Sequence, residues 1–325
     1  MAGRILVTGG HGFVGSYVVR ALLKRGYSIR CLVRSTSRTH RIDDLNVETV
    51  VGDILDRDSL VAAMEGCERC VHLAGISAYK DMQEDWTIPT IVSGTQNVLD
   101  AGLECGLERV VYIGSGIIYC SSDEGRICDE TTPFVLEESG LRYAIGKAKA
   151  EEVVDAYLEK GLDVVVAIPM ETYGPDDTEF LTTGYLKEAI NGWPALATHG
   201  GTSFAHVEDV AEGIVLSLEN GKKGERYILG GENASIKEII ELCLDVAGRS
   251  KPVLVLPTGL TKFVLRTLAK LRLPTPEHPN AVDYGTLFGY VTCDKAKAEL
   301  GYAPRPPREV MQSTVDWLRA AGHIS

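Results

Sequence analysis

Short apolar runs alternate with helical stretches up to residue 169, and this alternation limits the fold more than any other feature. The runs are rich in Val, Ile and Leu, as are strands that are buried on both faces of a parallel sheet. Strands joined by crossover helices predict an α/β fold, a doubly wound parallel (Rossmann) sheet with helices on both faces. The expected strands are 4–9, 28–33, 47–53, 69–75, 109–115 and 163–169, and the expected helices are 13–25, 57–65, 86–105 and one that contains Tyr143.

The composition indicates a globular protein and excludes several partners. Of 325 residues, 45% are hydrophobic and 24% charged, and the net charge of −12 argues against nucleic acid or an anionic membrane surface as the main partner. No apolar stretch reaches the roughly 18 residues of a membrane span. Because a strand begins almost at Met1, we expect no signal peptide and a cytoplasmic protein.

The eight cysteines are scattered along the chain, which is typical of reduced thiols. Cys67 and Cys70 form a C-x-x-C, but the chain has no second such pair with which to complete a zinc site. We therefore expect no metal site and no redox function for this pair.

A glycine-rich turn follows the first expected strand and opens the first helix. Gly9, Gly12 and Gly15 form a G-x-x-G-x-x-G pattern in "VTGGHGFVG". Glycines at such a turn let the backbone approach a phosphate, and the helix N-terminus then faces the pyrophosphate of a dinucleotide. We expect dinucleotide binding at this turn, with Phe13 and Val14 among the contacting residues.

The end of the second strand favours NADP(H) over NAD(H), with NAD as the alternative. NAD sites usually place an acidic residue here for the ribose hydroxyls, but this chain has Val33 followed by Arg34, with Arg38 nearby. Guanidinium groups suit a 2′-phosphate by charge and by donor geometry. After the third strand, Asp53 is either an acceptor for the adenine amino group, with Ile54 beside it, or simply a turn residue.

Three residues form a candidate reacting site. Ser115 follows the fifth strand, and Tyr143 and Lys147 lie one helical turn apart on the same face of a helix, a spacing that by itself is common by chance. A phenol of pKa about 10 is a weak acid near neutrality, and a neighbouring ammonium, together with the positive nicotinamide of the oxidised cofactor, would lower that pKa. We predict that Tyr143 donates a proton to a carbonyl during hydride transfer, while Ser115 holds the carbonyl oxygen.

The chain resembles the extended short-chain dehydrogenase/reductases, the NAD-dependent epimerase/dehydratase family, over nearly its whole length. The shared motifs are "TGGHGFVG", "GD" at 52–53, "HLAG" at 72–75, "SGT" at 93–95, "GSGIIY", "YAIGK", "YGP" at 173–175 and "HVEDVAEG" at 206–213. The segments 224–240 and 296–310 are most similar to the bacterial dihydroflavonol-reductase-like subgroup, which includes the hopanoid-associated sugar epimerase.

The resemblance implies the same roles for Ser115, Tyr143 and Lys147, and it implies that Lys147 also binds the nicotinamide ribose. It further implies a homodimer formed through the helices at 86–105 and 143–160. The remaining expected cofactor contacts are Leu73, Ala74, Gly75, Pro169 and Thr172.

Two departures from the family pattern bear on the reaction. Ile91 stands where relatives usually have an Asn that helps to seat the active-site helix or relay protons. Thr202 and Ile168 stand where nucleotide-sugar enzymes often have Arg to contact the diphosphate. These replacements favour an apolar or weakly charged small-molecule substrate.

Three functions are compatible with the sequence. The first is an NADP(H)-dependent oxidoreductase that reduces a ketone or aldehyde or oxidises the alcohol. The second is a sugar epimerase or dehydratase that keeps its cofactor bound, and the third is a redox-sensing NADP-binding protein. The expected substrate pocket is lined by 76–80, 170–173 and 180–206.

The regular alternation of strands and helices ends after residue 170, where turn-rich segments separate further helices and one strand at 225–231. We predict an NADP-binding Rossmann domain over 1–170 and a smaller substrate-binding part over 171–325, with some elements returning to the first. A basic amphipathic helix is expected over 258–272, with Lys262, Arg266 and Lys270 on one face. Its apolar residues Phe263, Val264 and Leu268 either pack on the core or form a lid or a membrane-facing patch.

Overall fold

The computed structural model describes residues 3–271 and 279–325, and its centre is a parallel sheet of seven strands. The predicted fold class is confirmed. The strand order is β11-β7-β5-β4-β1-β2-β3, so the order reverses between β1 and β4, which is where doubly wound sheets bind ligands. The strands are β1 (Arg4–Thr8), β2 (Ser28–Val33), β3 (Glu48–Val51), β4 (Arg69–His72), β5 (Arg109–Ile113), β7 (Val164–Pro169) and β11 (Arg226–Leu229).

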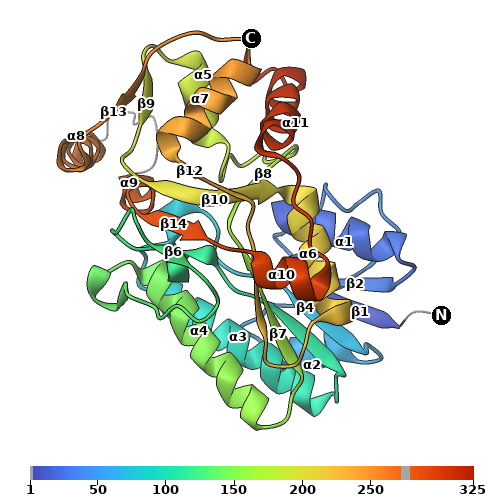
Figure 1. Cartoon of the computed structure of the whole chain (residues 1–325). Helices are drawn as coiled ribbons and strands as arrows, with labels where there is room; N and C mark the ends of the chain where they lie inside the picture. Colours follow the sequence, from blue (N-terminus) through green and yellow to red (C-terminus); the bar gives the residue numbers. More distant parts are fainter. Residues whose placement is uncertain (1–2, 272–278) are drawn as a thin grey trace.

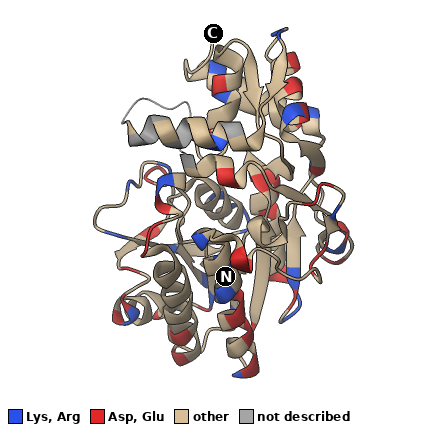
Figure 2. Ribbon diagram, turned by 90° about the vertical axis from the view of Figure 1, so that its left-hand side faces the viewer, with Lys and Arg blue, Asp and Glu red and all other residues tan. Residues whose placement is uncertain are grey.

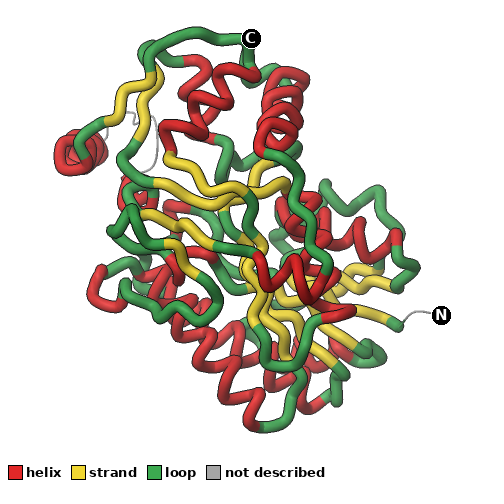
Figure 3. Tube along the Cα trace, in the orientation of Figure 1, coloured by secondary structure: helices red, strands yellow, loops and turns green. Residues whose placement is uncertain are grey.

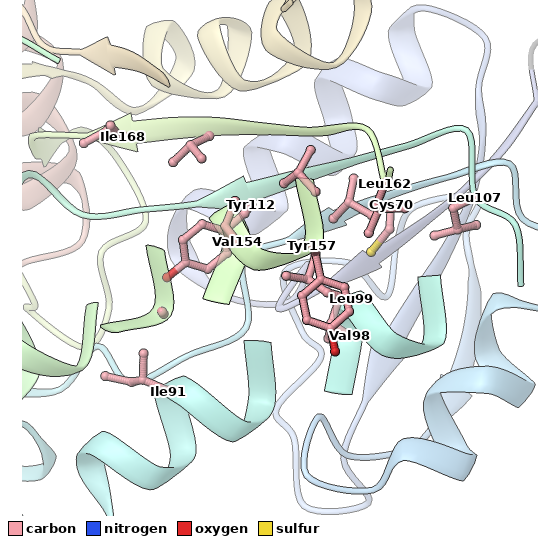
Figure 4. Close-up of a cluster of buried hydrophobic side chains, with 14 of the residues drawn as sticks. Cys70, Ile91, Val98, Leu99, Leu107, Tyr112, Val154, Tyr157, Leu162 and Ile168 are labelled. Carbon is pink, nitrogen blue, oxygen red and sulfur yellow. The ribbon is translucent and has the colours of Figure 1, made fainter. Parts of the chain in front are cut away.

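Helices cover both faces of this sheet (Figure 1). One face packs on α1 (Phe13–Lys24), α6 (Val207–Asn220) and α10 (Asp294–Leu300). The other packs on α2 (Arg57–Met64), α3 (Thr87–Glu104) and α4 (Arg142–Glu159). Alternate residues of β5 enter the two cores. Val111 lies in the first core, with α1, α6 and α10, whereas Val110 and Tyr112 lie in the second core, with α2, α3 and α4. Figure 4 shows the second core, in which Tyr112 of β5 lies near Val154 and Tyr157 of α4.

A second, smaller group of elements stands above the carboxyl ends of the large sheet, and Figure 3 shows its strands as a separate set. Its main sheet contains β12 (Glu232–Ser235), β10 (Gly201–His206), β14 (Phe288–Val291) and β6 (Ile127–Cys128), with β8 (Glu171–Tyr173) paired to β10. A separate pair is formed by β9 (Ala195–Ala197) and β13 (Val253–Val255). The third core lies between α5 (Gly184–Asn191), α7 (Ile236–Val246) and α11 (Pro307–Ala320).

Short 3-10 turns connect several of these elements near the junction of the two groups. They are η1 (Tyr79–Asp81), η2 (Gly116–Tyr119) and η3 (Glu137–Ser139). Two of them follow strands of the large sheet at its carboxyl edge: η1 follows β4, and η2 follows β5 and begins directly after Ser115.

The chain after residue 170 returns to the large sheet. The sequence assigned the strand at 225–231 to the smaller part, but β11 pairs in parallel with β7 at the edge of the large sheet. Tyr227, Ile228 and Leu229 are fully buried there, because both faces of this strand are covered by helices. The helix α6, which precedes β11, packs against α1.

The basic helix does not pack as predicted. α8 (Thr258–Lys270) lies along α9 (Pro279–Tyr284) at one side of the molecule (Figure 1), and Lys262 Nζ is 2.9 Å from Asp283 Oδ1. Phe263 and Val264 are 70% and 42% exposed, so the prediction that they pack on the core is wrong. The side chains of Arg266, Leu268 and Lys270, and residue 272, lie outside the described part of the chain.

The described residues contain no helix that is long and apolar enough to cross a membrane. Lys and Arg are interspersed with Asp and Glu along the helices and loops of the face in Figure 2. Cys67 and Cys70 are buried, and burial raises the pKa of both thiols. Both groups are therefore unionised at neutral pH, which disfavours thiolate chemistry.

Candidate active site

The glycine turn after β1 approaches the loop after β4 so closely that side chains are excluded. Gly9 has φ +73°, and a Cβ on it would lie 2.7 Å from the Ala74 nitrogen. A Cβ on Gly15 would lie 2.1 Å from the Gly9 oxygen. The next helix begins at Phe13 with Gly12 as its N-cap and no side-chain cap, so its first N–H groups stay open to an anion.

The Thr8 hydroxyl connects β1 to the loop after β4. It lies 2.7 Å from His72 Nδ1 and accepts a hydrogen bond from the Ala74 N–H at 3.2 Å. Burial, assisted by the charge of Lys147, lowers the pKa of His72 to about 3, so the ring that shares this hydrogen bond is neutral. Leu73, Ala74 and Gly75 are thereby held beside the glycine turn, at the point where the strand order reverses.

The basic residues after β2 lie where the sequence predicted. Val33 is buried, and Arg34 and Arg38 are exposed without an ion pair among the described residues. His11, in the glycine turn, was missed by sequence reasoning. Its pKa is lowered by burial and then by Arg34 and Arg41, and its buried Nδ1 has no hydrogen-bond partner in the described chain. An unpaired donor or acceptor at this turn fits a bound dinucleotide.

Arg41, in contrast, is a structural residue. It is buried, and its guanidinium donates to the Asp176 carboxylate at 3.1 Å and also to the Glu179 carboxylate and the Thr178 hydroxyl. It therefore joins the segment after β2 to the segment after β8 and is not available to a ligand.

Asp53 makes the contacts of a turn residue, and its predicted contact with the adenine amino group stays a prediction. Its Oδ1 accepts from the Leu55 N–H at 3.0 Å, and its own N–H donates to Ser59 Oγ at 3.1 Å. Ile54 packs against α3, where a Cβ on Gly94 would meet Ile54 Cδ1 at 2.7 Å.

Ser115, Tyr143 and Lys147 meet at the carboxyl end of β5. The Tyr143 hydroxyl donates to Ser115 Oγ at 3.3 Å, and Lys147 Nζ donates to the Ile113 carbonyl at 2.9 Å. Lys147 Nζ also lies 5.2 Å from the centre of the Tyr112 ring. The lysine thus fixes α4 on the end of β5 and brings the phenol to the serine.

Burial has the largest effect on the pKa values of Tyr143 and Lys147. Burial raises the pKa of Tyr143, and the hydrogen bond with Ser115 opposes that rise. Burial lowers the pKa of Lys147 to about 8, and the Glu151 carboxylate acts in the opposite direction. Burial thus sets the direction for Tyr143 in the polypeptide by itself, and the lowering of its pKa by Lys147 together with an oxidised nicotinamide stays a prediction for the cofactor complex.

Ile91 replaces the polar family residue with a packing contact. Its side chain is 3% exposed on α3, and a Cβ on Gly146 would lie 3.1 Å from Ile91 Cδ1. Gly146 directly precedes Lys147, so Ile91 supports α4 beside the site by shape and not by hydrogen bonding.

Pro169 lies at the same edge of the sheet as Ser115, since a Cβ on Gly116 would be 3.1 Å from its carbonyl oxygen. Thr172 is in β8 of the smaller sheet, and its buried hydroxyl donates to the Met170 carbonyl. Ile168 is fully buried in β7, and Thr202 Oγ1 donates to the Ser203 carbonyl. Neither Ile168 nor Thr202 carries a positive charge that could bind a diphosphate.

Two tyrosines border the site: Tyr79, which lies in the predicted pocket segment 76–80, and Tyr284, which sequence reasoning missed. The rings of Tyr143 and Tyr284 are 6.4 Å apart, and those of Tyr284 and Tyr79 are 6.1 Å apart. Tyr284 comes from α9, far along the chain from Tyr143, so no local pattern could have linked them. They make this side of the site aromatic.

Comparison with known proteins identifies the family. The NAD dependent epimerase/dehydratase family matches residues 5–230. The chain belongs to this family. It is therefore an NAD(P)-dependent enzyme of the short-chain dehydrogenase/reductase type, as the sequence motifs predicted.

The chain is similar to both reductases and dehydratases of the family. A putative dihydroflavonol 4-reductase of Synechocystis is 30% identical, covering 100% of this chain and 97% of the relative. A 4-hydroxy-2-methyl-3-oxo-4-farnesyl-3,4-dihydroquinoline-1-oxide ketoreductase of Stigmatella aurantiaca is also 30% identical, covering 98% and 96%. DesIV, a dTDP-glucose 4,6-dehydratase of Streptomyces venezuelae solved with NAD and TYD, is 26% identical with a TM-score of 0.78, covering 98% and 97%.

The glycine turn gives a first prediction. Gly9→Ala should lower the affinity for a dinucleotide more than tenfold, because its Cβ would displace the Ala74 backbone. Titration of cofactor fluorescence measures this. Gly26→Ala is the matched control, since Gly26 also has positive φ but no atom within 4 Å of its Cβ; it should cost about 1 kcal/mol of stability without changing affinity. Equal affinities for the two variants would contradict this account.

Ile91 gives a second prediction. Ile91→Asn should lower the free energy of unfolding by about 3 kcal/mol, because it removes packing and buries an amide without a partner. Ile91→Val should cost about 1 kcal/mol. Urea unfolding measures both. An Asn variant that is as stable as wild type and turns over faster would show that the position needs a polar group.

Proposed function

We propose that the protein is an NADP(H)-dependent oxidoreductase that reduces a ketone or aldehyde carbonyl, or oxidises the corresponding alcohol. The observation that carries this proposal is the Tyr143 hydroxyl within hydrogen-bond distance of Ser115 Oγ, one helical turn from Lys147. This group stands at the carboxyl edge of the sheet, the edge that also holds the glycine turn.

The chain's own residues supply the acid and the positioning. Ser115 and Tyr143 hydrogen-bond the carbonyl oxygen of the substrate, and the phenol donates its proton as negative charge develops on that oxygen. With a pKa of about 8, Lys147 is mostly protonated at pH 7, and its ammonium stabilises the resulting phenolate. The bound dinucleotide supplies hydride when reduced and accepts it when oxidised.

Several residues would bind that dinucleotide. Gly9, Gly12 and Gly15 allow the pyrophosphate to approach the uncapped N-terminus of α1. Arg34 and Arg38 are the unpaired cations for a 2′-phosphate, and the buried Val33 offers no acceptor to a free 2′-hydroxyl. These features support NADP(H) over NAD(H).

The surroundings of the site support a weakly charged, largely apolar substrate. Ile168 and Thr202 occupy the positions at which nucleotide-sugar enzymes often have an Arg that contacts the diphosphate. Tyr79 and Tyr284 place aromatic surface beside Tyr143. The ketoreductase from Stigmatella aurantiaca, whose name describes a farnesylated substrate, agrees with this class.

A sugar epimerase or dehydratase is the second candidate, and the similarity to DesIV supports it. The two reactions differ in whether the cofactor is consumed. Stoichiometric loss of NADPH absorbance with a ketone would support the reductase, whereas turnover of a nucleotide sugar without net cofactor change would support the second candidate.

The proposed acid gives a third prediction. Tyr143→Phe should lower kcat about 10²- to 10⁴-fold while leaving the affinity for NADPH nearly unchanged, because only the proton donor is lost. Steady-state kinetics and cofactor titration measure the two quantities. Tyr157→Phe is the matched control on the same helix, since its hydroxyl bonds Asp100 away from the site. Parallel loss of turnover and NADPH binding in the Tyr143 variant would indicate a structural role.

Cofactor choice gives a fourth prediction. Arg34→Ala should raise KM for NADPH about tenfold and leave KM for NADH unchanged, because it removes one charged hydrogen bond to the 2′-phosphate. Arg308→Ala, at an exposed residue paired with Asp245, is the control. A wild-type enzyme with a lower KM for NADH than for NADPH would contradict the NADP(H) assignment.

A further inference from the structure

Glu151 is a buried carboxylate on α4, one helical turn beyond Lys147, and only one of its two oxygens has a partner. The residue is 8% exposed. Its Oε2 accepts a hydrogen bond from Arg226 Nε at 2.9 Å, whereas Oε1 has no hydrogen-bond partner among the residues that the structure describes. A buried carboxylate oxygen is costly to leave unpaired, so the ion pair with Arg226 does not by itself account for Glu151.

The free oxygen lies over the end of β5, where the side chain of Lys147 also ends. A Cβ on Gly114 would be 3.1 Å from Glu151 Oε1, and Lys147 Nζ is 2.9 Å from the carbonyl oxygen of the preceding residue, Ile113. Residues 147 and 151 are four positions apart on one helix, so their side chains leave the same face of α4. Both charged groups therefore lie beside the peptide that joins Ile113 to Gly114.

Lys147 has hydrogen-bonding capacity left for a partner. Its ammonium carries three protons, and the described residues provide one acceptor, the Ile113 carbonyl. The ring of Tyr112 borders it, and the buried Tyr112 hydroxyl is also without a hydrogen-bond partner in the described chain. Lys147 and Glu151 form no direct ion pair within that part of the chain. Buried polar groups that lie close together without touching are commonly connected by a water molecule.

The surroundings of the pair make Glu151 the main negative charge beside Lys147. The neighbouring side chains of α3 are isoleucines, and those of β7 are Val166 and Ile168. Burial keeps the imidazole and the phenols around the pair uncharged at neutral pH. Asp155 lies one turn further along α4 and its side chain is 56% exposed. The titratable groups that face Lys147 or Glu151 are His72, Tyr112, Tyr119, Tyr143, Asp155 and Arg226.

We propose that Glu151 is a positioning residue for the proposed acid: its free oxygen accepts a hydrogen bond from the Lys147 ammonium through one water molecule, and its charge keeps that lysine protonated beside Tyr143. The ion pair with Arg226 favours the ionised carboxylate. The charge of Glu151 also opposes the lowering of the Lys147 pKa by burial. This inference rests on the proposed reductase function and deepens it, because a charged Lys147 stabilises the phenolate that remains when Tyr143 has donated its proton.

The titration of Lys147 tests the proposal without requiring turnover. Carbon-13 NMR of the lysine Cε atoms follows the ammonium across pH in the free enzyme and in its NADP complex, and the loss of a signal in Lys147→Met assigns it. Glu151→Gln should lower the midpoint of this titration by about one pH unit, because it removes a negative charge beside a buried ammonium. Glu151→Asp keeps the charge and should restore at least half of that shift. Asp155→Asn is the matched control, since Asp155 bonds the same Arg226, and it should leave the midpoint unchanged.

The pH dependence of turnover and a crystal structure keep the outcomes distinct. With NADPH and a ketone, the alkaline fall in kcat should move to lower pH in Glu151→Gln by the same amount as the Lys147 midpoint, and Asp155→Asn should keep the wild-type profile. Crystals of the NADP complex should show a water within hydrogen-bond distance of Lys147 Nζ and Glu151 Oε1, and protein atoms in that place would overturn the bridge.

Two NMR results would overturn the role of Glu151: equal midpoints in wild type and Glu151→Gln, or equal shifts in Glu151→Gln and Glu151→Asp. A midpoint that moves as expected, in an enzyme that turns over a nucleotide sugar without net loss of NADPH, would support the role of Glu151 and overturn the reductase proposal.

Discussion

The hydrogen bond from Lys147 Nζ to the Ile113 carbonyl, 2.9 Å long, is the contact on which the candidate site depends. It fixes α4 against the carboxyl end of β5, and this places the phenol of Tyr143 over Ser115. α4 also packs closely against α3. Gly146 allows this because it leaves room for Ile91 beside the lysine. The chemistry therefore rests on a backbone carbonyl and on the packing of an aliphatic side chain.

The glycine turn contributes the other half of the site by the same kind of close approach. The left-handed backbone of Gly9 brings the turn onto the Ala74 backbone, and the Thr8 hydroxyl bonds His72 of β4 and Ala74 of the loop that follows it. Both halves meet at one edge of the sheet because parallel strands end together there. The order reverses between β1 and β4, so the two connecting loops turn apart and leave this edge accessible.

Much of this arrangement was predictable, because it follows from local patterns. Each strand expected before residue 170 is present, and Ser115 lies at the predicted edge. Predictions that depended on surroundings succeeded less well. The strand at 225–231 joined the large sheet, and Phe263 and Val264 of α8 are exposed. Burial, which no spacing reveals, raises the pKa of Tyr143 where the nearby charge alone suggested the opposite.

The sequence by itself determined the fold class, the glycine turn and the one-turn spacing of Tyr143 and Lys147, because periodicity and short motifs encode backbone conformation directly. Only the tertiary structure decided which side chains meet across long separations. It brought Tyr284 to Tyr143 and paired Arg41 with Asp176. Burial and pairing belong to the folded environment of a residue, which segments distant in the chain supply together.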